Sequence, residues 1–314
     1  MSAPGVTSLR LGTRGSTLAL AQARAVAELL EAGLGRPVEL VRVSTTGDRN
    51  RGSLTEIGGQ GVFVGAVRDA LADGEVDLAV HSLKDLPTTE DPRVVLAAVP
   101  TRADPRDALV ARDGLTLGEL PAGATIGTGS PRRAAQLHGL GLGLDVVAIR
   151  GNVDTRLRLV SEGAVDGVLL ARAGLLRLGR QHEVTEVLDP LQMLPAPGQG
   201  ALAVEVAAHA ERLRLDVAAL LDDADSHCAV TAERALLNEL EAGCSAPVGA
   251  LADVAVGDDG PELWLRAVVA AFDGSAFVRL STTGPPSDAD GVGRRLARDM
   301  LADGAADLIS ESVA

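Results

Sequence analysis

The sequence predicts an α/β protein with two lobes, each built on a mixed sheet, and a small α+β domain at the C-terminal end. Short apolar runs alternate with helical patterns, which is typical of parallel or mixed sheets with crossover helices. This alternation starts again after the segment 102–106, and after about Asp223 a long helical pattern leads into strand patterns that follow one another directly. With 314 residues, the chain is also too long for one ordinary core.

The first lobe is assigned to residues 1–103 and 198–222. Ser16 is the predicted N-cap of its first helix, which Gly33 closes, and a second helix over 62–72 stops at Gly74. Its strands are expected at 9–12, 38–43, 76–80 and 94–99, and a strand at 201–206 returns to it after the segment 194–200.

The second lobe is assigned to residues 104–197 and the α+β domain to residues 223–314. The α+β domain begins with a helix over 229–241 and continues as an antiparallel meander with Asp273-Gly274 as a hairpin turn. The other expected elements are strands at 125–128, 144–149, 165–170, 248–256, 263–271 and 276–282, and helices at 131–137, 153–160, 172–178 and 292–302.

The composition excludes several classes of function. A net charge of −14, with one Trp, three Phe and no Tyr, argues against nucleic-acid binding, which needs basic surfaces and aromatic platforms. No apolar run approaches the roughly 18 residues of a membrane span, and the N-terminus shows no secretory signal. Cys228, Cys244 and the histidines lack metal-ligand spacing, so no metal is expected. We therefore expect a cytoplasmic protein with no nucleic-acid or membrane partner, and a monomer.

Lys84 and Asp85 form the first candidate site. Lys84 is the only lysine of the chain, and only lysine offers a compact charge whose pKa shifts readily. Both residues directly follow a predicted strand, and ligands bind at the carboxyl ends of strands in open α/β sheets. On an extended segment they would point opposite ways, so that one holds the ligand and the other moves protons. A solvated ion pair in a loop is the alternative interpretation.

The segment 127–133 is the second candidate site. Thr128 precedes Ser130, a predicted N-cap, and a proline at the first helical position, so a helix N-terminus with free N–H groups is expected to favour an anion. Arg132 and Arg133 add guanidinium groups that match carboxylates in a bidentate manner. The segment predicts the charge of a ligand without its identity, and a capped helix with two surface arginines is the alternative.

Two further strand ends carry arginines. Arg14 follows the first predicted strand, and Arg150 and Arg156 flank the start of the helix over 153–160. Together with the pair at 132–133, they predict a cleft for a ligand with several carboxylates. The glycine-rich segment 58–61 lacks the Lys-Ser/Thr of a phosphate loop, so nucleotide hydrolysis is not expected.

Cys244 lies just beyond a predicted helix end. Gly243 is expected in the left-handed capping position before it. The negative end of a helix dipole does not lower the pKa of a thiol, which argues against a thiolate protease. A thiol that is alkylated once and then serves as an anchor is compatible with this position. Cys228, within the helical pattern, is expected to be a small buried hydrophobe.

These features together resemble the porphobilinogen deaminase family (hydroxymethylbilane synthase), over nearly the whole chain and in that family's order. The resemblance implies an enzyme that joins four porphobilinogen molecules head to tail, releases ammonia and forms hydroxymethylbilane in tetrapyrrole (haem) biosynthesis. It also implies a covalent dipyrromethane cofactor, held through a thioether on Cys244. The segments that carry the resemblance are 80–87, 104–108, 127–133, 150–156, 197–203, 231–234 and 241–249.

The resemblance also implies roles for single residues. Asp85 matches the catalytic aspartate, and a carboxylate there can stabilise the cation that remains when ammonia leaves porphobilinogen and can move protons. Gln199 lies in the matching segment between the lobes. The residues that match the positions binding acetate and propionate side chains are Arg14, Ser16, Lys84, Thr128, Ser130, Arg132, Arg133, Arg150 and Arg156.

The chain departs from the family pattern in its basic residues. Gln60 stands where many members carry a lysine, Glu56 replaces a lysine found in some members, and Leu176 stands where a basic residue can occur. Arg49 or Arg51 could supply the missing charge.

Functions of two other classes stay open at this point. The first two lobes resemble periplasmic-binding proteins, so an anion-binding module without chemistry is one alternative, which Cys244 in the third domain disfavours. A Schiff-base lyase that uses Lys84 is the other, and borohydride trapping with a carbonyl substrate would identify it.

Overall fold

The computed structural model describes residues 8–43, 64–243, 246–257 and 260–310, and the chain divides into two compact units. Unit 1 comprises residues 1–102 and 201–227, and unit 2 comprises residues 103–200 and 228–314. The predictions made for Arg49, Arg51, Glu56, Gln60 and Cys244 fall outside the described residues.

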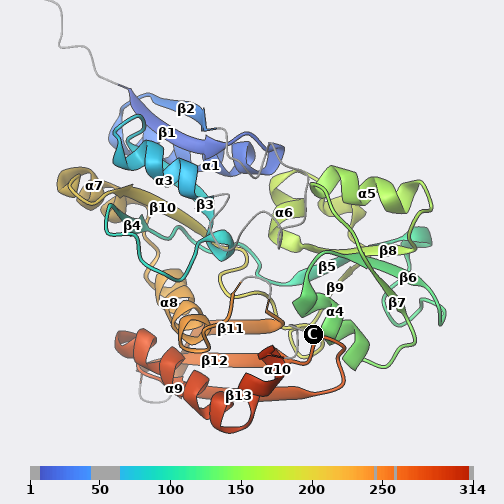
Figure 1. Cartoon of the computed structure of the whole chain (residues 1–314). Coiled ribbons are helices and arrows are strands. Elements are labelled where there is room, and N and C mark those ends of the chain that lie inside the picture. The colour runs from blue at the N-terminus through green and yellow to red at the C-terminus, as the bar shows by residue number, and fades with distance from the viewer. Residues whose placement is uncertain (1–7, 44–63, 244–245, 258–259, 311–314) are drawn as a thin grey trace, which may run out of the picture. The chain divides into compact units, whose positions relative to one another are not determined.

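Unit 1 contains a five-stranded mixed sheet in the order β2-β1-β3-β10-β4 (Figure 1). β1 runs parallel to β2 and β3, whereas β10 is antiparallel to β3 and β4. The predicted return of the chain to the first lobe is thereby confirmed. The elements are β1 (Leu9–Arg14), α1 (Thr17–Leu34), β2 (Val38–Val43), α3 (Gly65–Ala72), β3 (Leu78–Ser82), β4 (Val94–Ala98), β10 (Leu202–Ala207) and α7 (Glu211–Leu221).

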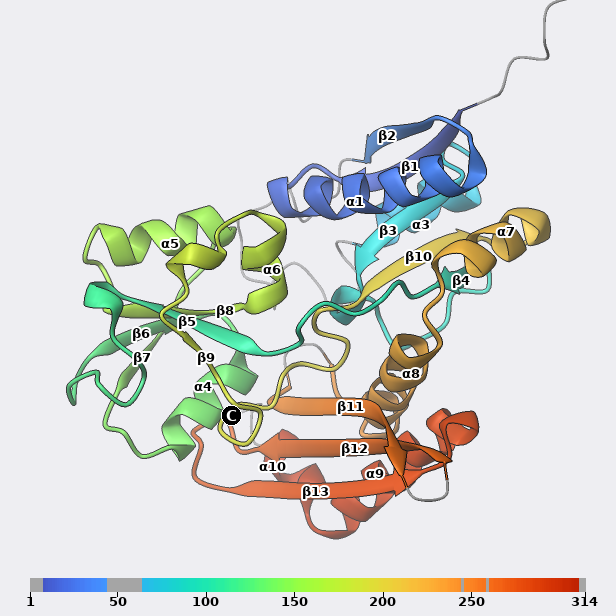
Figure 2. The same ribbon diagram turned by 180° about the vertical axis from the view of Figure 1, so that it is seen from behind.

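Helices cover both faces of this sheet because its strands are apolar on both sides. Successive side chains of a strand point to opposite faces. In β3, Leu78 and Val80 pack in one core with Leu30 of α1 and Val217 of α7, while Ala79 packs in another with Leu71 of α3. Figures 1 and 2 show α1 and α3 on opposite faces accordingly.

The two ends of α1 show how local chemistry sets a helix boundary. The Ser16 hydroxyl accepts a hydrogen bond from the Ala19 N–H at 3.2 Å, so the predicted N-cap is confirmed. The predicted stop at Gly33 is wrong, because the left-handed residue is Gly35, with φ of 61°. Gly33 instead allows close packing, since a Cβ there would lie 2.3 Å from Cδ1 of Leu220.

Unit 2 contains a second five-stranded mixed sheet, in the order β7-β6-β8-β5-β9. β6 is parallel to β7 and β8, and β5 is antiparallel to β8 and β9. The short strands β5 and β9 were not expected from the sequence. The elements are β5 (Asp107–Ala111), β6 (Thr125–Thr128), α4 (Pro131–Gly139), β7 (Asp145–Ala148), α5 (Val153–Ser161), β8 (Gly167–Ala171), α6 (Arg172–Arg177) and β9 (Glu186–Val187).

The remainder of unit 2 is an antiparallel sheet, β11-β12-β13, with helices on one face (Figure 1). Leu236, Leu265 and Leu296 belong to one buried core that joins α8 and α9 to the strands. The turn at Asp273-Gly274 is confirmed, with Gly274 at φ of 74°. The elements are α8 (Ala224–Glu239), whose first turn belongs to unit 1, β11 (Val248–Gly257), β12 (Gly260–Ala270), β13 (Phe277–Gly284), α9 (Ala289–Ala302) and α10 (Ala305–Ser310).

These two mixed sheets and the α+β portion confirm the predicted fold class, whereas the boundaries of the three domains stay a prediction. Short 3₁₀ turns complete the chain: η1 (Leu83–Asp85), η2 (Arg112–Gly114), η3 (Gln181–Glu183) and η4 (Pro286–Asp288). Over the described ranges, none of the helices combines the length and the apolar character needed to cross a bilayer.

Candidate active site

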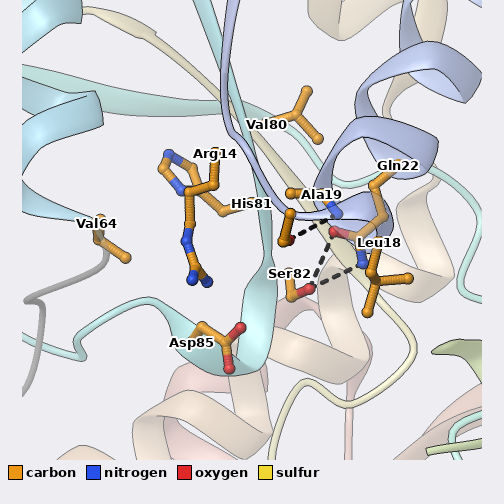
Figure 3. Close-up of a pocket in the computed structure, with 10 residues that line it drawn as sticks. Arg14, Leu18, Ala19, Gln22, Val64, Val80, His81, Ser82 and Asp85 are labelled. Atoms are coloured by element: carbon orange, nitrogen blue, oxygen red, sulfur yellow. Dashed lines mark hydrogen bonds between the residues drawn. The ribbon is translucent and has the colours of Figure 1, made fainter. Parts of the chain in front are cut away.

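A pocket of unit 1 lies where β1 and β3 end. Arg14 is the last residue of β1, and Asp85 belongs to the turn η1 that follows β3. β1 and β3 are parallel neighbours, so their carboxyl ends meet at one edge of the sheet. Figure 3 shows the Arg14 guanidinium and the Asp85 carboxylate extending into the same space. The structure therefore brings together two residues that lie 71 positions apart (85 − 14) in the sequence.

Lys84 and Asp85 lie in a helical turn, so the predicted extended segment is wrong. The Leu86 N–H donates to the Leu83 carbonyl at 3.0 Å and closes one 3₁₀ turn. Leu83 and Leu86 are buried, and they pull the turn onto the core. Asp85 is exposed and Lys84 half-buried, so the two side chains still occupy different environments. The segment turns because Leu83 and Leu86 lie three positions apart. A strand would place them on opposite faces, whereas the turn lets both reach the core.

Gln22 and Ser82 form a polar wall of the same pocket (Figure 3). The Gln22 amide donates to the Ser82 hydroxyl at 2.8 Å, and that hydroxyl donates back to Gln22 Oε1 at 3.2 Å. Gln22 is only 4% exposed, although it lies on the apolar face of α1. Sequence reasoning missed it, and a polar residue at a core position of the helix was the available signal.

A buried ionic cluster lies behind the pocket wall. Arg68 of α3 donates to both carboxylate oxygens of Glu205 on β10, at 2.6 and 3.1 Å. His81, which lines the pocket, has Nε2 at 3.3 Å from Glu205 Oε2. Burial alone would raise the pKa of Glu205, but His81 and Arg68 outweigh it and lower this pKa to about 2. His81 therefore contacts the buried Glu205 and also lines the pocket.

This cluster predicts an acid-dependent loss of stability. The folded-state pKa of Glu205 is about 2, and its ordinary value is 4.5. The ionised carboxylate therefore makes its full contribution to the free energy of unfolding above about pH 4.5. We expect it to disappear as the pH falls from 4.5 to 2, at a cost of about 3 kcal/mol in the free energy of unfolding. Denaturant unfolding of the wild type and of Glu205→Gln at several pH values measures it. Equal pH slopes in the two proteins would contradict the assignment.

The second cluster lies at the carboxyl edge of the unit 2 sheet. Arg132 and Arg133 lie in the first turn of α4 and are only 3% and 5% exposed, so the alternative of two surface arginines is wrong. Both pair with the fully buried carboxylate of Asp107: Arg132 Nη2 lies 2.8 Å from Oδ2, and Arg133 Nη2 lies 2.8 Å from Oδ1. Sequence reasoning did not single out Asp107 as a site residue, although it heads an apolar run and lies in the segment 104–108 that carries the family resemblance.

Thr128 and Ser130 precede the two arginines in the chain, and Gln199 contacts Asp107. The Thr128 hydroxyl accepts from the Ser130 N–H at 3.2 Å, and the Ser130 hydroxyl makes no capping bond to α4. The Gln199 amide donates to Asp107 Oδ1 at 2.8 Å and to the Pro105 carbonyl at 2.7 Å. Gln199 thus supports the acid that holds the arginines.

Arg150, Arg156 and Arg177 add cations in unit 2. Arg150 is exposed after β7, and Arg156 Nε donates to the Gly151 carbonyl at 2.9 Å. Burial and then the charge of Arg133 lower the pKa of Arg156, and burial lowers that of Arg177 to about 10. Within the part of the chain that the structure describes, no ion pair joins Arg156 or Arg177 to a carboxylate. Half-buried guanidinium groups without an acid among the described residues are suited to carboxylate ligands.

Arg177 was not predicted. The neighbouring Leu176 is 52% exposed, whereas Arg177 is half-buried and donates to the Gly200 carbonyl at 2.7 Å. Leu176 and Arg177 differ in burial because their side chains point in different directions from α6. This helix has only six residues, which is too short for a hydrophobic pattern to reveal that direction.

The helix before Cys244 ends differently from the prediction. α8 ends at Glu239, and Glu241 takes the left-handed conformation, with φ of 50°. The role predicted for Gly243 is therefore wrong, because the helix stops earlier than the sequence pattern indicated. Cys228 is half-buried within α8 and donates to the Pro286 carbonyl at 3.3 Å. In the described portions of the chain, no three His, Cys, Asp or Glu side chains are placed to hold a metal ion.

The sequence matches two family models. Residues 9–215 match the porphobilinogen deaminase, dipyromethane cofactor binding domain, and residues 227–302 match the porphobilinogen deaminase C-terminal domain. Porphobilinogen deaminase of Nocardia farcinica is 58% identical over 98% of this chain and 90% of its own length. That of Mycobacterium avium is 57% identical over 96% of both chains.

Solved structures with a similar arrangement include an ABC-transporter periplasmic substrate-binding protein from Coxiella burnetii. It is 17% identical, with a TM-score of 0.44, and the match covers 68% of this chain and 91% of that protein. A substrate-binding domain of GlnP from Lactococcus lactis is 10% identical, with a TM-score of 0.42, over 69% and 89% of the two chains.

Proposed function

Because the chain belongs to the porphobilinogen deaminase family, we propose that Asp85 and the arginine clusters of the two units carry out that family's reaction. The enzyme condenses four porphobilinogen molecules head to tail, with release of ammonia, to hydroxymethylbilane in tetrapyrrole biosynthesis. The observation that carries the assignment is the exposed Asp85 carboxylate beside Arg14 in the pocket of unit 1.

Asp85 performs the proton chemistry. When ammonia leaves porphobilinogen, the substrate becomes a cation conjugated to its pyrrole N–H, and a carboxylate stabilises that charge where it develops. Protons must also reach the leaving amine and leave the new bond, which a positioned carboxylate can do. Exposure keeps Asp85 accessible, and the buried Leu83 and Leu86 fix the turn that carries it.

The cationic and polar residues bind the acetate and propionate side chains. Arg14 and Lys84 act beside Asp85 in unit 1, with Ser16 as a further polar contact. Thr128, Ser130, Arg132, Arg133, Arg150 and Arg156 act at the sheet edge of unit 2, with Gln199 as support. A linear tetrapyrrole is rich in carboxylates, which guanidinium and ammonium groups bind.

The residues present fit a dipyrromethane cofactor. Its carboxylates need guanidinium partners, and Arg156 and Arg132 supply them: among the described residues, Arg156 pairs with no acid and the buried Nε of Arg132 makes no hydrogen bond. When bound, the cofactor supplies the pyrrole ring to which the first substrate is joined. Cys244 forms the thioether in this proposal, and this residue lies outside the described ranges.

Family membership decides against the two other functions considered. A Schiff-base lyase would use Lys84 as nucleophile, whereas in this proposal Lys84 binds carboxylates. A cytoplasmic monomer without nucleic-acid or membrane partners belongs to the same proposal. The net charge of −14 supports the lack of a nucleic-acid partner, and light scattering on the holoprotein measures the mass of the assembly.

Arg156 and Arg158 offer a matched test of the arginine assignment. Both lie on α5, but Arg156 is half-buried beside the 127–133 segment and Arg158 is exposed. We expect Arg156→Ala to lower kcat/KM for porphobilinogen by roughly 10- to 100-fold, because a hydrogen bond to a charged group is worth about 1.5–3 kcal/mol. Arg158→Ala should stay within about twofold. The measurement is steady-state formation of hydroxymethylbilane, and equal values for both variants would contradict the role of Arg156.

A further inference from the structure

Asp107 holds three side chains from two other segments of unit 2. Its Oδ2 lies 2.8 Å from Arg132 Nη2, and its Oδ1 accepts from Arg133 Nη2 at 2.8 Å and Nε at 3.1 Å. The Gln199 amide donates to the same Oδ1 at 2.8 Å. Asp107 is fully buried, so these contacts and not solvent satisfy its charge.

The antiparallel direction of β5 explains this position. Asp107 is the first residue of β5 and pairs with Ala171, the last residue of β8. An acid at the beginning of β5 therefore lies at the edge where the parallel strands β6 and β8 end. Arg133 spans that edge, because its Nη1 also donates to the Leu169 carbonyl of β8 at 3.0 Å. Arg132 Nη1 donates to the Leu194 carbonyl.

The charges of the cluster do not cancel. Two buried guanidinium groups share one carboxylate, and both lie at the N-terminal end of α4, where the helix dipole disfavours cations. The charges of Arg132 and Arg133, with hydrogen bonds from Arg133 and Gln199, outweigh burial and hold the pKa of Asp107 well below its usual range. Asp107 is thus ionised, and within the described ranges the cluster has two guanidinium groups and one carboxylate, which leaves one positive charge.

Asp107 could act in two ways, which predict opposite results. If it only reduced positive charge, its removal would strengthen the binding of a carboxylate ligand. If it holds the guanidinium groups in a fixed direction, its removal would weaken binding, although the positive charge increases. The four contacts from Arg132, Arg133 and Gln199 to the two oxygens of one acid, together with the carbonyl contacts, leave each arginine one orientation.

We propose that Asp107 is a positioning residue for the polymerisation: it orients Arg132 and Arg133 and leaves one positive charge for a carboxylate of the substrate or the growing chain. This inference rests on the proposed function, because it assumes that these arginines bind pyrrole carboxylates. Asp107 itself is not a catalytic residue, since it is 0% exposed.

Asp107→Asn tests the inference in the holoenzyme. We expect KM for porphobilinogen to rise roughly 10- to 100-fold, with a smaller fall in kcat, because misplaced binding groups lose their substrate contacts. Asp104→Asn is the matched control: Asp104 also pairs with two arginines, Arg106 and Arg172, outside α4. Its KM should stay within about twofold. A KM that is unchanged or lower in Asp107→Asn, or an equal rise in Asp104→Asn, would overturn the positioning role.

A second comparison applies if the single variant Asp107→Asn does not fold, because it removes one buried positive charge together with the buried acid. The single variant Arg133→Met leaves one arginine paired with Asp107, and the double variant Asp107→Asn, Arg133→Met leaves one arginine without an acid. We expect the double variant to have a KM at least about threefold higher than the single one, despite its greater positive charge. A KM equal to or below that of the single variant would refute the inference. Normal KM values in both Arg132→Ala and Arg133→Ala would instead refute the carboxylate role of the arginines and the inference with it.

Discussion

Replacing Cys244 by serine is expected to give a folded protein that carries no dipyrromethane and forms no measurable hydroxymethylbilane. A hydroxyl is a far weaker nucleophile than a thiol, so the thioether that anchors the growing chain cannot form. Intact mass spectrometry is the measurement: the wild-type holoprotein should exceed the mass of the encoded chain by one dipyrromethane, and peptide mapping should locate it on Cys244. The circular dichroism of Cys244→Ser should match that of the wild type.

Cys228→Ser is the matched control for this experiment. Cys228 is half-buried in α8 and its thiol donates to the Pro286 carbonyl, a contact that a serine hydroxyl can also make. We expect this variant to keep both the adduct and the activity. An active wild type with an unmodified mass, or an adduct on Cys228, would exclude Cys244 as the anchor.

Asp85→Asn is expected to keep the cofactor and bind porphobilinogen, yet release ammonia at least about 100-fold more slowly. The amide keeps the size of the side chain but loses the negative charge and the basicity, and general acid–base catalysis is worth about 10²–10⁴-fold. Single-turnover ammonia release on cofactor-loaded enzyme separates this chemical step from substrate binding.

Lys84→Arg provides the comparison for Asp85→Asn, because both residues share the turn η1. Arginine keeps a positive charge for carboxylates, so mainly the affinity for porphobilinogen should fall, with ammonia release nearly normal. If Lys84→Arg were chemically inactive and Asp85→Asn reacted at the normal rate, the roles of the two residues would be reversed and lysine chemistry would return as the mechanism.

Much of the candidate site was predictable because it lies at strand ends. Arg14 ends β1, and Asp85 and Arg150 follow β3 and β7, whose apolar runs are visible in the sequence; within each sheet, parallel strands bring their carboxyl ends to one edge. Ser16 was predictable for a different reason, since a hydroxyl before an amphipathic helix satisfies a free N–H three residues on.

Errors of the sequence prediction arose where helix and strand ends depend on distant contacts. Gly33 was predicted to end the first helix, but α1 continues to Leu34 and Gly35 takes the left-handed conformation. Gly33 has no Cβ and instead allows close packing against Leu220. Lys84 and Asp85 looked extended, but the burial of Leu83 and Leu86 makes that segment turn. In each case a tertiary contact outweighed a local preference of about 1 kcal/mol or less.

The sequence by itself determined the α/β class, the order of most elements and the family, because periodicity, capping residues and motifs are local properties of a chain; the catalytic role of Asp85 stays a prediction. Only the tertiary structure decided which charges are shared inside the protein. Asp107 reaches Arg132 and Arg133 because β5 runs antiparallel to β8, and Glu205 reaches Arg68 and His81 because β10 returns beside β3. A buried charge needs a partner, and strand pairing between distant segments, which no local pattern records, chooses that partner.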